Sequence, residues 1–436
     1  MDLININRQL AQGKLDTSSM FPHLHRLNQS PIVFAWNFGL DKLPDEPGIL
    51  LIRGPRQYGK SSWLEQQLAT TIEEFGAGSG FYLNGDFLAH GEQLAEALEA
   101  LAVSFPTSTR VKRIFIDEIT AIKDWEQILK RLVDRGTLRD LLVVTTGSKA
   151  TDLRRGSERL PGRKGKLART TYFFTPISYA AFHKACHSQL GDKTLHSYLL
   201  AGGAPIACTE IALHGRIPEY VTELLRDWVE GEVAKAGRHR SALINILQLL
   251  FRFGATPVGQ AKLAREAGLA NNVVAQGYIE LLSDLGCVLP AYPWDTDKGQ
   301  YILRKPCKYH FVNLLAAWAY SPRQVHTTEE FEALPREEQA IWYEWAVAQE
   351  LYRRASIAGS RLLDPLAFWQ SKAHEIDFYD PNEGFIEVKL GSSMPLEFSW
   401  FPKQFPRDKL RIINRSSFST EQLDGLTLEA FLLSQP

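Results

Sequence analysis

Apolar runs alternate with helical periodicity between about residues 47 and 175. The runs are short and read as strands: Ile49–Arg53, Gly80–Leu83, Arg113–Asp117, Leu141–Thr146 and Thr170–Phe174. Buried strands that alternate with helices are typical of a parallel sheet covered by helices on both faces. The pattern therefore predicts an α/β fold for this region.

The remaining chain reads differently. Residues 176–240 have a helical pattern that Gly202-Gly203-Ala204-Pro205 interrupts. Residues 241–325 contain a helix–turn–helix pattern and a following strand pair. After the polar stretch Thr327–Glu338, a long amphipathic helix opens a last region that ends in strands.

Composition excludes few classes of function. The 436 residues carry a formal net charge of −1, so any contact with nucleic acid must be local rather than a property of the whole molecule. Four scattered cysteines without metal-ligand spacing predict reduced thiols. The N-terminal segment MDLININRQL lacks a signal-peptide pattern, and no apolar run reaches membrane-spanning length. We expect a cytoplasmic protein with no membrane contact.

The segment from Gly54 to Ser61 has the phosphate-loop pattern G-x-x-x-x-G-K-[ST], and it follows an apolar strand and precedes a helix. Such a loop binds phosphate through backbone N–H groups and a helix N-terminus. The alternative, a plain glycine turn between strand and helix, is less consistent with this context. The predicted nucleotide-binding residues are Gly54, Pro55, Arg56, Gln57, Tyr58, Gly59, Lys60, Ser61 and Ser62. We expect Lys60 to contact the β- and γ-phosphates of ATP and Ser61 to ligate Mg²⁺.

Two further segments complete the predicted nucleotide site. The strand Arg113–Asp117 is expected beside the loop, with Asp117 holding Mg²⁺ and Glu118 orienting or deprotonating a water. Ser148 follows another strand end, where a hydroxyl is able to reach the γ-phosphate. Arg163 lies in an Arg-dense stretch and is the preferred arginine finger, acting in cis or from a neighbouring subunit. A basic solvated loop is the alternative for that stretch.

Several segments together resemble the AAA-type P-loop ATPases of a large prokaryotic family whose C-terminal domain has a poorly defined role. They are GPRQYGKSS, FIDEITAIKDWEQILKRLVDRG, VVTTGSKATDLRRGSERLPGRKGK, FTPISYAAF and LAGGAP. The resemblance implies the same roles for Lys60, Ser61, Asp117 and Glu118, and it puts Ser148 in the sensor position and Arg163 in that of the finger. Tyr58, where a small aliphatic residue is usual, and Thr120, in place of a common Gln, depart from the family pattern.

A helix–turn–helix is predicted from Gln260–Ala267, the turn Gly268-Leu269 and Ala270–Leu285, with a wing between Ile302 and Phe311. Asn271, Asn272, Gln276 and Tyr278 are candidates for base contacts. The second helix has no Lys or Arg, which weakens its hold on phosphates, although basic residues nearby compensate: Lys262, Arg265, Lys298, Arg304, Lys305 and Lys308. Two interpretations therefore stand, a DNA-binding module and a packing module.

The C-terminal strands carry a second set of charged residues. If the turn centres near Asn382, a hairpin places Asp377 opposite Glu387, and a divalent metal would relieve the repulsion between the two carboxylates. Acid, then acid-x-Lys ending at Lys389, resembles the PD-(D/E)XK nuclease core, and by that resemblance Glu344 on the preceding helix is a third metal ligand. The alternative is a Glu/Lys pair on an exposed strand face.

These observations predict a P-loop NTPase module with a helical lid, a winged helix and a C-terminal restriction-endonuclease-like α/β domain. The predicted segments are an N-terminal lead at 1–30, the AAA-type core at 31–175, the lid at 176–240, the winged helix at 241–325 and the nuclease-like domain at 326–436. The predicted function is Mg²⁺-dependent ATP hydrolysis coupled to the other domains, with ATP or ADP, DNA and further copies of the chain as candidate partners. The alternatives are a slow ATP-switched binding protein and an ATP-gated, metal-dependent nuclease.

Overall fold

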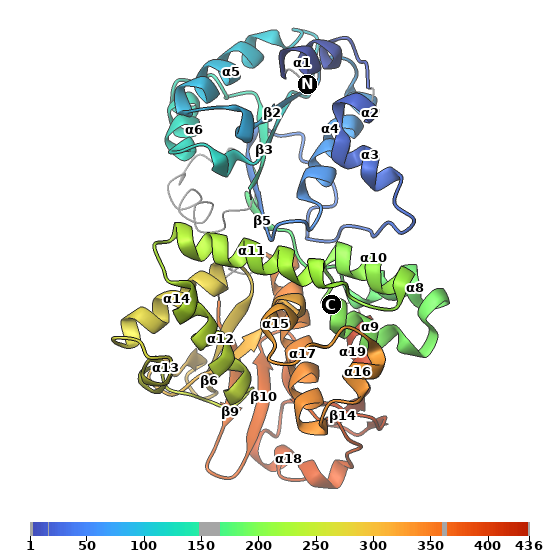
Figure 1. Cartoon of the computed structure of the whole chain (residues 1–436), viewed down its shortest axis with the longest axis vertical. Helices are drawn as coiled ribbons and strands as arrows, with labels where there is room; N and C mark the ends of the chain where they lie inside the picture. Colours follow the sequence, from blue (N-terminus) through green and yellow to red (C-terminus); the bar gives the residue numbers. More distant parts are fainter. Residues whose placement is uncertain (1–2, 16, 148–165, 360–363, 435–436) are drawn as a thin grey trace. The chain divides into compact units, whose positions relative to one another are not determined.

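The computed structural model describes residues 3–15, 17–147, 166–359 and 364–434 (Figure 1). The chain divides into two compact units. The first, the N-terminal unit, contains residues up to 175 together with 356–359; the second, the C-terminal unit, contains 176–355 and the chain from 360 onward. The chain passes from the first unit to the second between residues 175 and 176.

The N-terminal unit contains a parallel sheet of five strands in the order β2-β3-β4-β1-β5. The predicted strands are all present and differ from the prediction by one residue at most at either end. They are β1 (Gly48–Arg53), β2 (Gly80–Asn84), β3 (Arg113–Asp117), β4 (Leu142–Gly147) and β5 (Thr171–Phe173). The P-loop-type α/β fold of this unit is therefore confirmed.

Helices cover this sheet because its strands are apolar on both faces. Leu50, Ile114, Phe115 and Val143 are fully buried, so neither face of the sheet meets water. The helices and 3₁₀ turns of the unit are α1 (Leu3–Ala11), α2 (Thr17–Met20), α3 (Pro22–Asn28), α4 (Lys60–Phe75), η1 (Gly85–Phe87), α5 (Gly91–Ser104), η2 (Ile119–Ala121) and α6 (Trp125–Asp134).

The C-terminal unit begins with helices, as predicted for residues 176–240. They are α8 (Tyr179–Leu190), η3 (Gly191–Lys193), α9 (Thr194–Ala201), α10 (Pro205–His214), α11 (Glu219–Lys235) and α12 (Arg240–Phe253). Gly202 ends α9 with a φ of 61°, and a Cβ there would lie 2.4 Å from the Leu315 backbone nitrogen, so only glycine fits this crossing. Pro205 starts α10, where its missing N–H costs nothing.

Two helices form at the positions predicted for a helix–turn–helix. They are α13 (Gln260–Glu266) and α14 (Asn272–Asp284), and the side chain of Asn271 caps α14 by accepting from the Val274 N–H at 3.0 Å. Three strands follow, β6 (Val288–Asp295), β7 (Gln300–Tyr301) and β8 (Lys308–Phe311), and β6 pairs antiparallel with both of the others. The helices α15 (Leu314–Tyr320), α16 (Thr328–Glu332) and α17 (Arg336–Ala358) lead to the C-terminal strands.

These three strands and the C-terminal strands form one mixed sheet in the order β13-β14-β12-β11-β10-β9-β6-β7, with β8 paired to β6. The C-terminal elements are β9 (Leu366–Gln370), β10 (Glu375–Asp380), β11 (Gly384–Val388), η4 (Pro395–Phe398), α18 (Phe401–Gln404), β12 (Leu410–Ile413), β13 (Phe418–Ser419), β14 (Leu423–Leu426) and α19 (Leu428–Leu433). Because β6 pairs in parallel with β9, the strands that follow α14 are a structural part of the C-terminal sheet.

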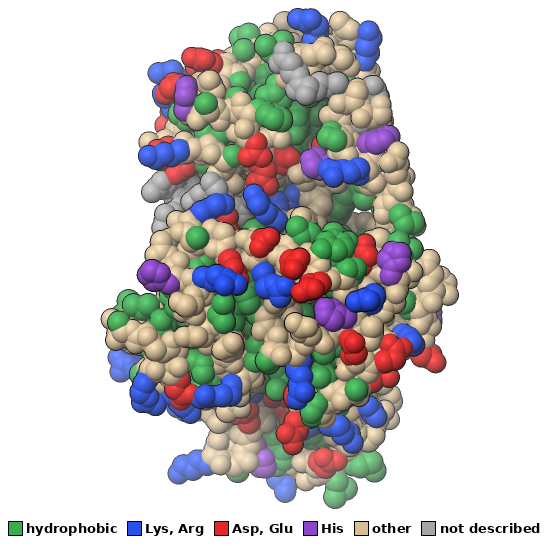
Figure 2. All heavy atoms as spheres, viewed as in Figure 1, with side chains coloured by type: hydrophobic (Ala, Val, Ile, Leu, Met, Phe, Trp, Pro, Cys, Tyr) green, Lys and Arg blue, Asp and Glu red, His purple; other side chains and the backbone are tan. Residues whose placement is uncertain are grey.

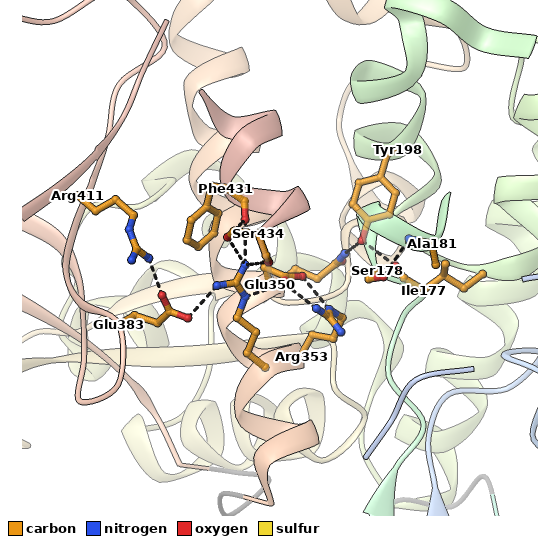
Figure 3. Close-up of polar contacts among 12 residues, drawn as sticks. Ile177, Ser178, Ala181, Tyr198, Glu350, Arg353, Glu383, Arg411, Phe431 and Ser434 are labelled. Atoms are coloured by element: carbon orange, nitrogen blue, oxygen red, sulfur yellow. Dashed lines mark hydrogen bonds and ion pairs between the residues drawn. The ribbon is translucent and has the colours of Figure 1, made fainter. Parts of the chain in front are cut away.

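A buried ion network fixes the last helix to α17 (Figure 3). Glu350 binds Arg353 at 2.7 Å and Arg354 at 2.8 Å, and Arg354 also binds Glu383 at 2.8 Å. The same Arg354 guanidinium donates to the carbonyl oxygens of Phe431 and Ser434 at 2.9 and 2.8 Å, at the C-terminal end of α19. Charged side chains pointing at these carbonyls explain how a helix of six residues is held in place.

Two other expectations concern the whole chain. All four cysteines are buried and unpaired, as the reduced-thiol prediction requires. Among the helices of the described ranges, none combines the length and the apolar character needed to cross a membrane.

Candidate nucleotide site and a C-terminal carboxylate cluster

The phosphate loop connects the end of β1 to the start of α4, as the sequence pattern predicts. Gly59 caps α4 with a φ of 95°, a left-handed conformation that glycine adopts without strain. Gly54 lies so close to Phe174 that a Cβ would meet the Phe174 Cβ and carbonyl oxygen at 2.8 Å. Gln57 has a φ of 62°, and a second residue with positive φ within the loop helps its backbone to curve. The two glycines of the pattern are thus required by geometry.

Lys60 is buried in this loop with 5% of its surface exposed. Its Nζ donates to the carbonyl oxygens of Gly54 at 3.0 Å and Pro55 at 2.7 Å. Burial lowers the pKa of the ammonium, and the charges of Glu118 and Asp117 partly offset that effect. The ammonium is therefore held by neutral acceptors, which an anionic phosphate oxygen is able to replace with a stronger, charge-assisted bond.

The acidic pair at the end of β3 has a defined geometry. Asp117 is 2% exposed, and its Oδ1 accepts hydrogen bonds from the Thr146 hydroxyl and from the Glu118 N–H at 3.1 Å. Glu118 has a left-handed backbone with a φ of 46°, a conformation that costs a non-glycine residue about 1–3 kcal/mol and is common at functional sites. A Cβ on Gly85 would lie 2.3 Å from the Glu118 carbonyl oxygen, so this turn needs glycine beside it.

The acidic strand β3 is not adjacent to the strand that enters the loop, because β4 lies between β1 and β3. Since all three strands are parallel, their carboxyl ends still meet at one edge of the sheet. The Thr146 hydroxyl of β4 donates to Asp117 Oδ1 and so orients this carboxylate.

The other predicted nucleotide-binding residues are placed as follows. Tyr58 is 3% exposed and packs inward, whereas Arg56 and Gln57 lie at the surface. Ser61 is half-buried in the first turn of α4, and the Ser62 hydroxyl donates to the His23 carbonyl at 3.4 Å. Ser148 and Arg163 lie outside the described residues.

A buried acid near the loop was missed by sequence reasoning. Glu65 on α4 is 1% exposed, and its carboxylate accepts the Leu24 N–H of α3 at 2.7 Å. Burial raises its pKa to about 7. An acid within the apolar stripe of a helix, next to Trp63, Leu64 and Leu68, was the signal available in the sequence.

In the C-terminal unit, the predicted hairpin forms. β10 and β11 pair Phe378 with Ile386, a register that continues to Asp377 opposite Glu387. The Asp377 N–H donates to Glu387 Oε2 at 3.2 Å, and Asp377 Oδ2 accepts the Val388 N–H at 2.9 Å. Burial, followed by the charge of Asp377, raises the pKa of Glu387 to about 7. The structure therefore brings these two acids together.

A lysine from the helix–turn–helix region lies among these acids. Lys308 of β8 has a side chain that is 2% exposed, and its Nζ lies 2.7 Å from Glu375 Oε1, 3.2 Å from Asp377 Oδ1 and 3.6 Å from Glu344 Oε1. Burial by itself lowers the pKa of this ammonium, but the charges of Glu344, Asp377 and Glu375 outweigh burial and raise it. We call Lys308, Glu344, Glu375, Asp377 and Glu387 the carboxylate cluster.

The carboxylate cluster does not fit a divalent metal as it stands. Across the described ranges, no three His, Cys, Asp or Glu side chains are arranged to hold a metal ion. The ammonium of Lys308 lies between Glu344 and Asp377, two of the predicted ligands. Lys389, the predicted nuclease-like lysine, is at the rim: its side chain is 47% exposed and binds Glu387 at 2.5 Å.

The helix–turn–helix offers fewer base-contacting groups than predicted. Tyr278 is 3% exposed, and its hydroxyl bonds the His239 N–H at 2.8 Å and the His239 carbonyl at 3.2 Å, so it faces the protein. Gln276 bonds Glu280 at 2.9 Å. Lys308, one of the compensating basic residues, is buried in the carboxylate cluster. On the face drawn in Figure 2, basic and acidic side chains are interspersed without a broad patch of one sign.

Comparisons with known proteins give matches to two family models, which together lie within residues 46–317. Residues 46–183 match the model of a family described as AAA domain, and residues 192–317 match a domain of unknown function, DUF8612. A search of curated protein sequences found no match.

Among solved structures, the chain is similar to the Walker-type ATPase PABY2304 of Pyrococcus abyssi, with 14% identity over 69% of this chain and 95% of that one and a TM-score of 0.42. It is also similar to the Aeropyrum pernix ORC1 protein in complex with DNA, with 15% identity, 73% and 91% coverage and a TM-score of 0.33. The A. pernix ORC2 protein, in ADPNP and ADP complexes, has 12% identity, 65% and 86% coverage and a TM-score of 0.36.

At these TM-scores the assignment rests on the family match and the local geometry. The strand, loop and helix around Lys60 and the acids after β3 all fall within the matched residues. Residues 46–183 therefore match the AAA domain family and contain a P-loop α/β fold.

Proposed function

We propose that the protein is a Mg²⁺-dependent ATPase that uses the loop Gly54–Ser62 to bind the triphosphate. The observation that carries the proposal is the buried Lys60, held at the phosphate loop by two carbonyl oxygens and near the charges of Asp117 and Glu118. The N-terminus of α4 supplies backbone N–H groups that favour anions, and α4 is long enough for that effect to be substantial.

The residues fit a nucleotide–Mg²⁺ complex in defined roles. Ser61 and Asp117 would hold the metal, which polarises the γ-phosphate when bound. Glu118 would orient or deprotonate the attacking water, with Gly85 and Thr146 supporting its turn. We further propose Ser148 as the sensor and Arg163 as the arginine finger, acting in cis or from a neighbouring copy. Only the sequence resemblance supports these two roles.

We further propose that the nucleotide state is transmitted to the C-terminal unit. Support comes from Gly54, which contacts Phe174 directly, one residue before the N-terminal unit ends at Thr175. The Phe174 N–H also donates to the Arg53 carbonyl at 2.6 Å. A movement of the phosphate loop would therefore displace Phe174 and Thr175, the residues that connect the N-terminal unit to the C-terminal unit. We also propose DNA as a partner, and the helix–turn–helix pattern of the sequence is the support for this proposal.

ATP hydrolysis by wild type and Lys60→Ala, with and without single- and double-stranded DNA, tests the proposal. We expect Mg²⁺-dependent turnover in wild type and its loss in Lys60→Ala. Lys42→Ala is the matched control, since Lys42 is an exposed lysine of the same unit that pairs with Glu74; it should behave as wild type. Equal rates in wild type and Lys60→Ala would refute hydrolysis at this site.

The second candidate, a slow ATP-switched binding protein, is distinguished by rate. Turnover below roughly one per minute without stimulation by DNA, well under typical enzyme rates, would favour the switch.

A further inference from the structure

The carboxylate cluster contains its own cation. Three carboxylates from two elements, Glu344 on α17 and Glu375 and Asp377 on β10, converge on one ammonium that a third element, β8, delivers. Close, like-charged carboxylates are unfavourable in a buried setting unless a cation lies among them. Here the counter-charge is a side chain.

The ammonium is firmly placed. The Lys308 side chain is 2% exposed, and its Nζ also lies 5.2 Å from the centre of the Phe368 ring. β8 pairs with β6 over four residue pairs, from Val288 with Phe311 to Ala291 with Lys308. Withdrawal of Lys308 would break buried ion pairs and would require part of the sheet to rearrange.

The remaining polar groups of the cluster point to the same arrangement. Glu344 Oε1 has no hydrogen-bond partner within the described part of the chain; it lies 3.6 Å from Lys308 Nζ and 3.8 Å from His310 Nδ1. A divalent ion bound by Glu344 and Asp377 would lie next to the Lys308 ammonium and be repelled by it. The Lys308 ammonium therefore already occupies the position near Glu344 and Asp377 in which a metal ion would be placed.

We propose that Lys308 is a built-in substitute for a divalent metal, so that the cluster of Glu344, Asp377 and Glu387 takes up no Mg²⁺ or Mn²⁺ in the wild-type protein. The lysine then serves to join β8 to α17 and β10. The C-terminal sheet is a binding or scaffolding module in this arrangement and not a metal-dependent nuclease. The inference is independent of ATP hydrolysis in the N-terminal unit.

Manganese binding to the nucleotide-free, full-length protein tests this proposal, with bound Mn²⁺ followed by electron paramagnetic resonance. We expect no Mn²⁺ bound at the cluster of wild type. Lys308→Met, which keeps the apolar stem and removes the charge, should bind one Mn²⁺ at least tenfold more tightly than wild type. Adding Asp377→Asn to Lys308→Met should abolish that gain.

Lys235→Met is the matched control, because Lys235 pairs with a single carboxylate, that of Glu232 at 2.8 Å; it should gain no Mn²⁺. If Lys308→Met does not fold, Lys308→Met/Glu375→Gln removes one carboxylate along with the ammonium and leaves Glu344 and Asp377 to bind Mn²⁺. Wild-type Mn²⁺ binding that Asp377→Asn weakens would overturn the proposal. A folded Lys308 variant without any gain in Mn²⁺ affinity would overturn it equally.

Discussion

Each unit of this protein buries a lysine near carboxylates, and the two lysines differ in what holds them. Lys60 donates to two backbone carbonyls, and burial lowers its pKa. Lys308 lies within ion-pair distance of three carboxylates, which raise its pKa in spite of burial. The Lys60 ammonium can leave its neutral carbonyl acceptors for a phosphate oxygen. The Lys308 ammonium is held more strongly, because its partners are buried carboxylates. The same residue type is thus suited to ligand binding in one unit and to structure in the other.

The largest effect expected from this comparison is at the acid beside Lys60. Glu118→Gln keeps the shape of the side chain but removes its basicity, so ATP hydrolysis should slow by about 10²–10⁴-fold, the usual contribution of a general base. ATP binding should persist, because Lys60 and the loop are intact. Single-turnover kinetics and equilibrium binding measure the two quantities separately.

Glu99→Gln is the control for that variant, since Glu99 is a surface acid of the same unit, 3.8 Å from Arg135. Its turnover should equal that of wild type. A wild-type rate of ATP hydrolysis in Glu118→Gln would show that Glu118 is not the general base.

The second largest effect is on the stability of the C-terminal unit. Lys308→Met leaves buried carboxylates without their cation, which typically costs about 3–5 kcal/mol. Hydrogen exchange of the amides in β8 and β10 reports this loss locally, and urea unfolding reports it for the unit. Lys235→Met, with a side chain that is 53% exposed, should change stability by less than about 0.5 kcal/mol. Similar free energies of unfolding for Lys308→Met and Lys235→Met would show that the ion pairs of Lys308 do not stabilise the C-terminal unit.

A smaller effect concerns the pH dependence of the N-terminal unit. Because Glu65 has a folded pKa of about 7, above its ordinary value of 4.5, the folded state retains its proton to higher pH than the unfolded chain. Its contribution is therefore most favourable below pH 4.5 and is lost as the pH rises through about 7, a change of roughly 1–3 kcal/mol. Glu65→Gln still has an oxygen for the Leu24 N–H and should lose this slope in urea unfolding between pH 5 and 8. An unchanged slope would assign the pH dependence to another group.

The smallest effect is expected at the rim of the carboxylate cluster. Lys389 pairs with Glu387, but its side chain is 47% exposed, so solvent screens the pair. Lys389→Met should cost at most about 1 kcal/mol in urea unfolding, well below the effect of Lys308→Met. A loss as large as that of Lys308→Met would mean that both lysines support the cluster.

Local patterns predicted a large part of this fold. The five strands of the N-terminal sheet, the loop glycines and the helix after Lys60 depend on residues close in sequence, and all are found where expected. The C-terminal hairpin, in which Asp377 lies opposite Glu387, was predicted for the same reason, because a tight turn sets the register of its two strands.

Interactions between distant residues were not predictable in this way. Tyr278 was read as a base-contacting residue, but its hydroxyl bonds the backbone of His239. Which segment lies beside α14 depends on the packing of the whole unit and not on the periodicity of the helix.

The amino-acid sequence alone determined the phosphate loop, the acids after β3 and the opposed carboxylates of the C-terminal hairpin, because each depends on spacing within a few residues. The tertiary structure decided that Lys308, more than sixty positions before Asp377, would supply the cation among those carboxylates. The physical reason is that a buried charge is balanced by whichever group the fold brings within about 4 Å, and the fold, not the spacing, selects that group.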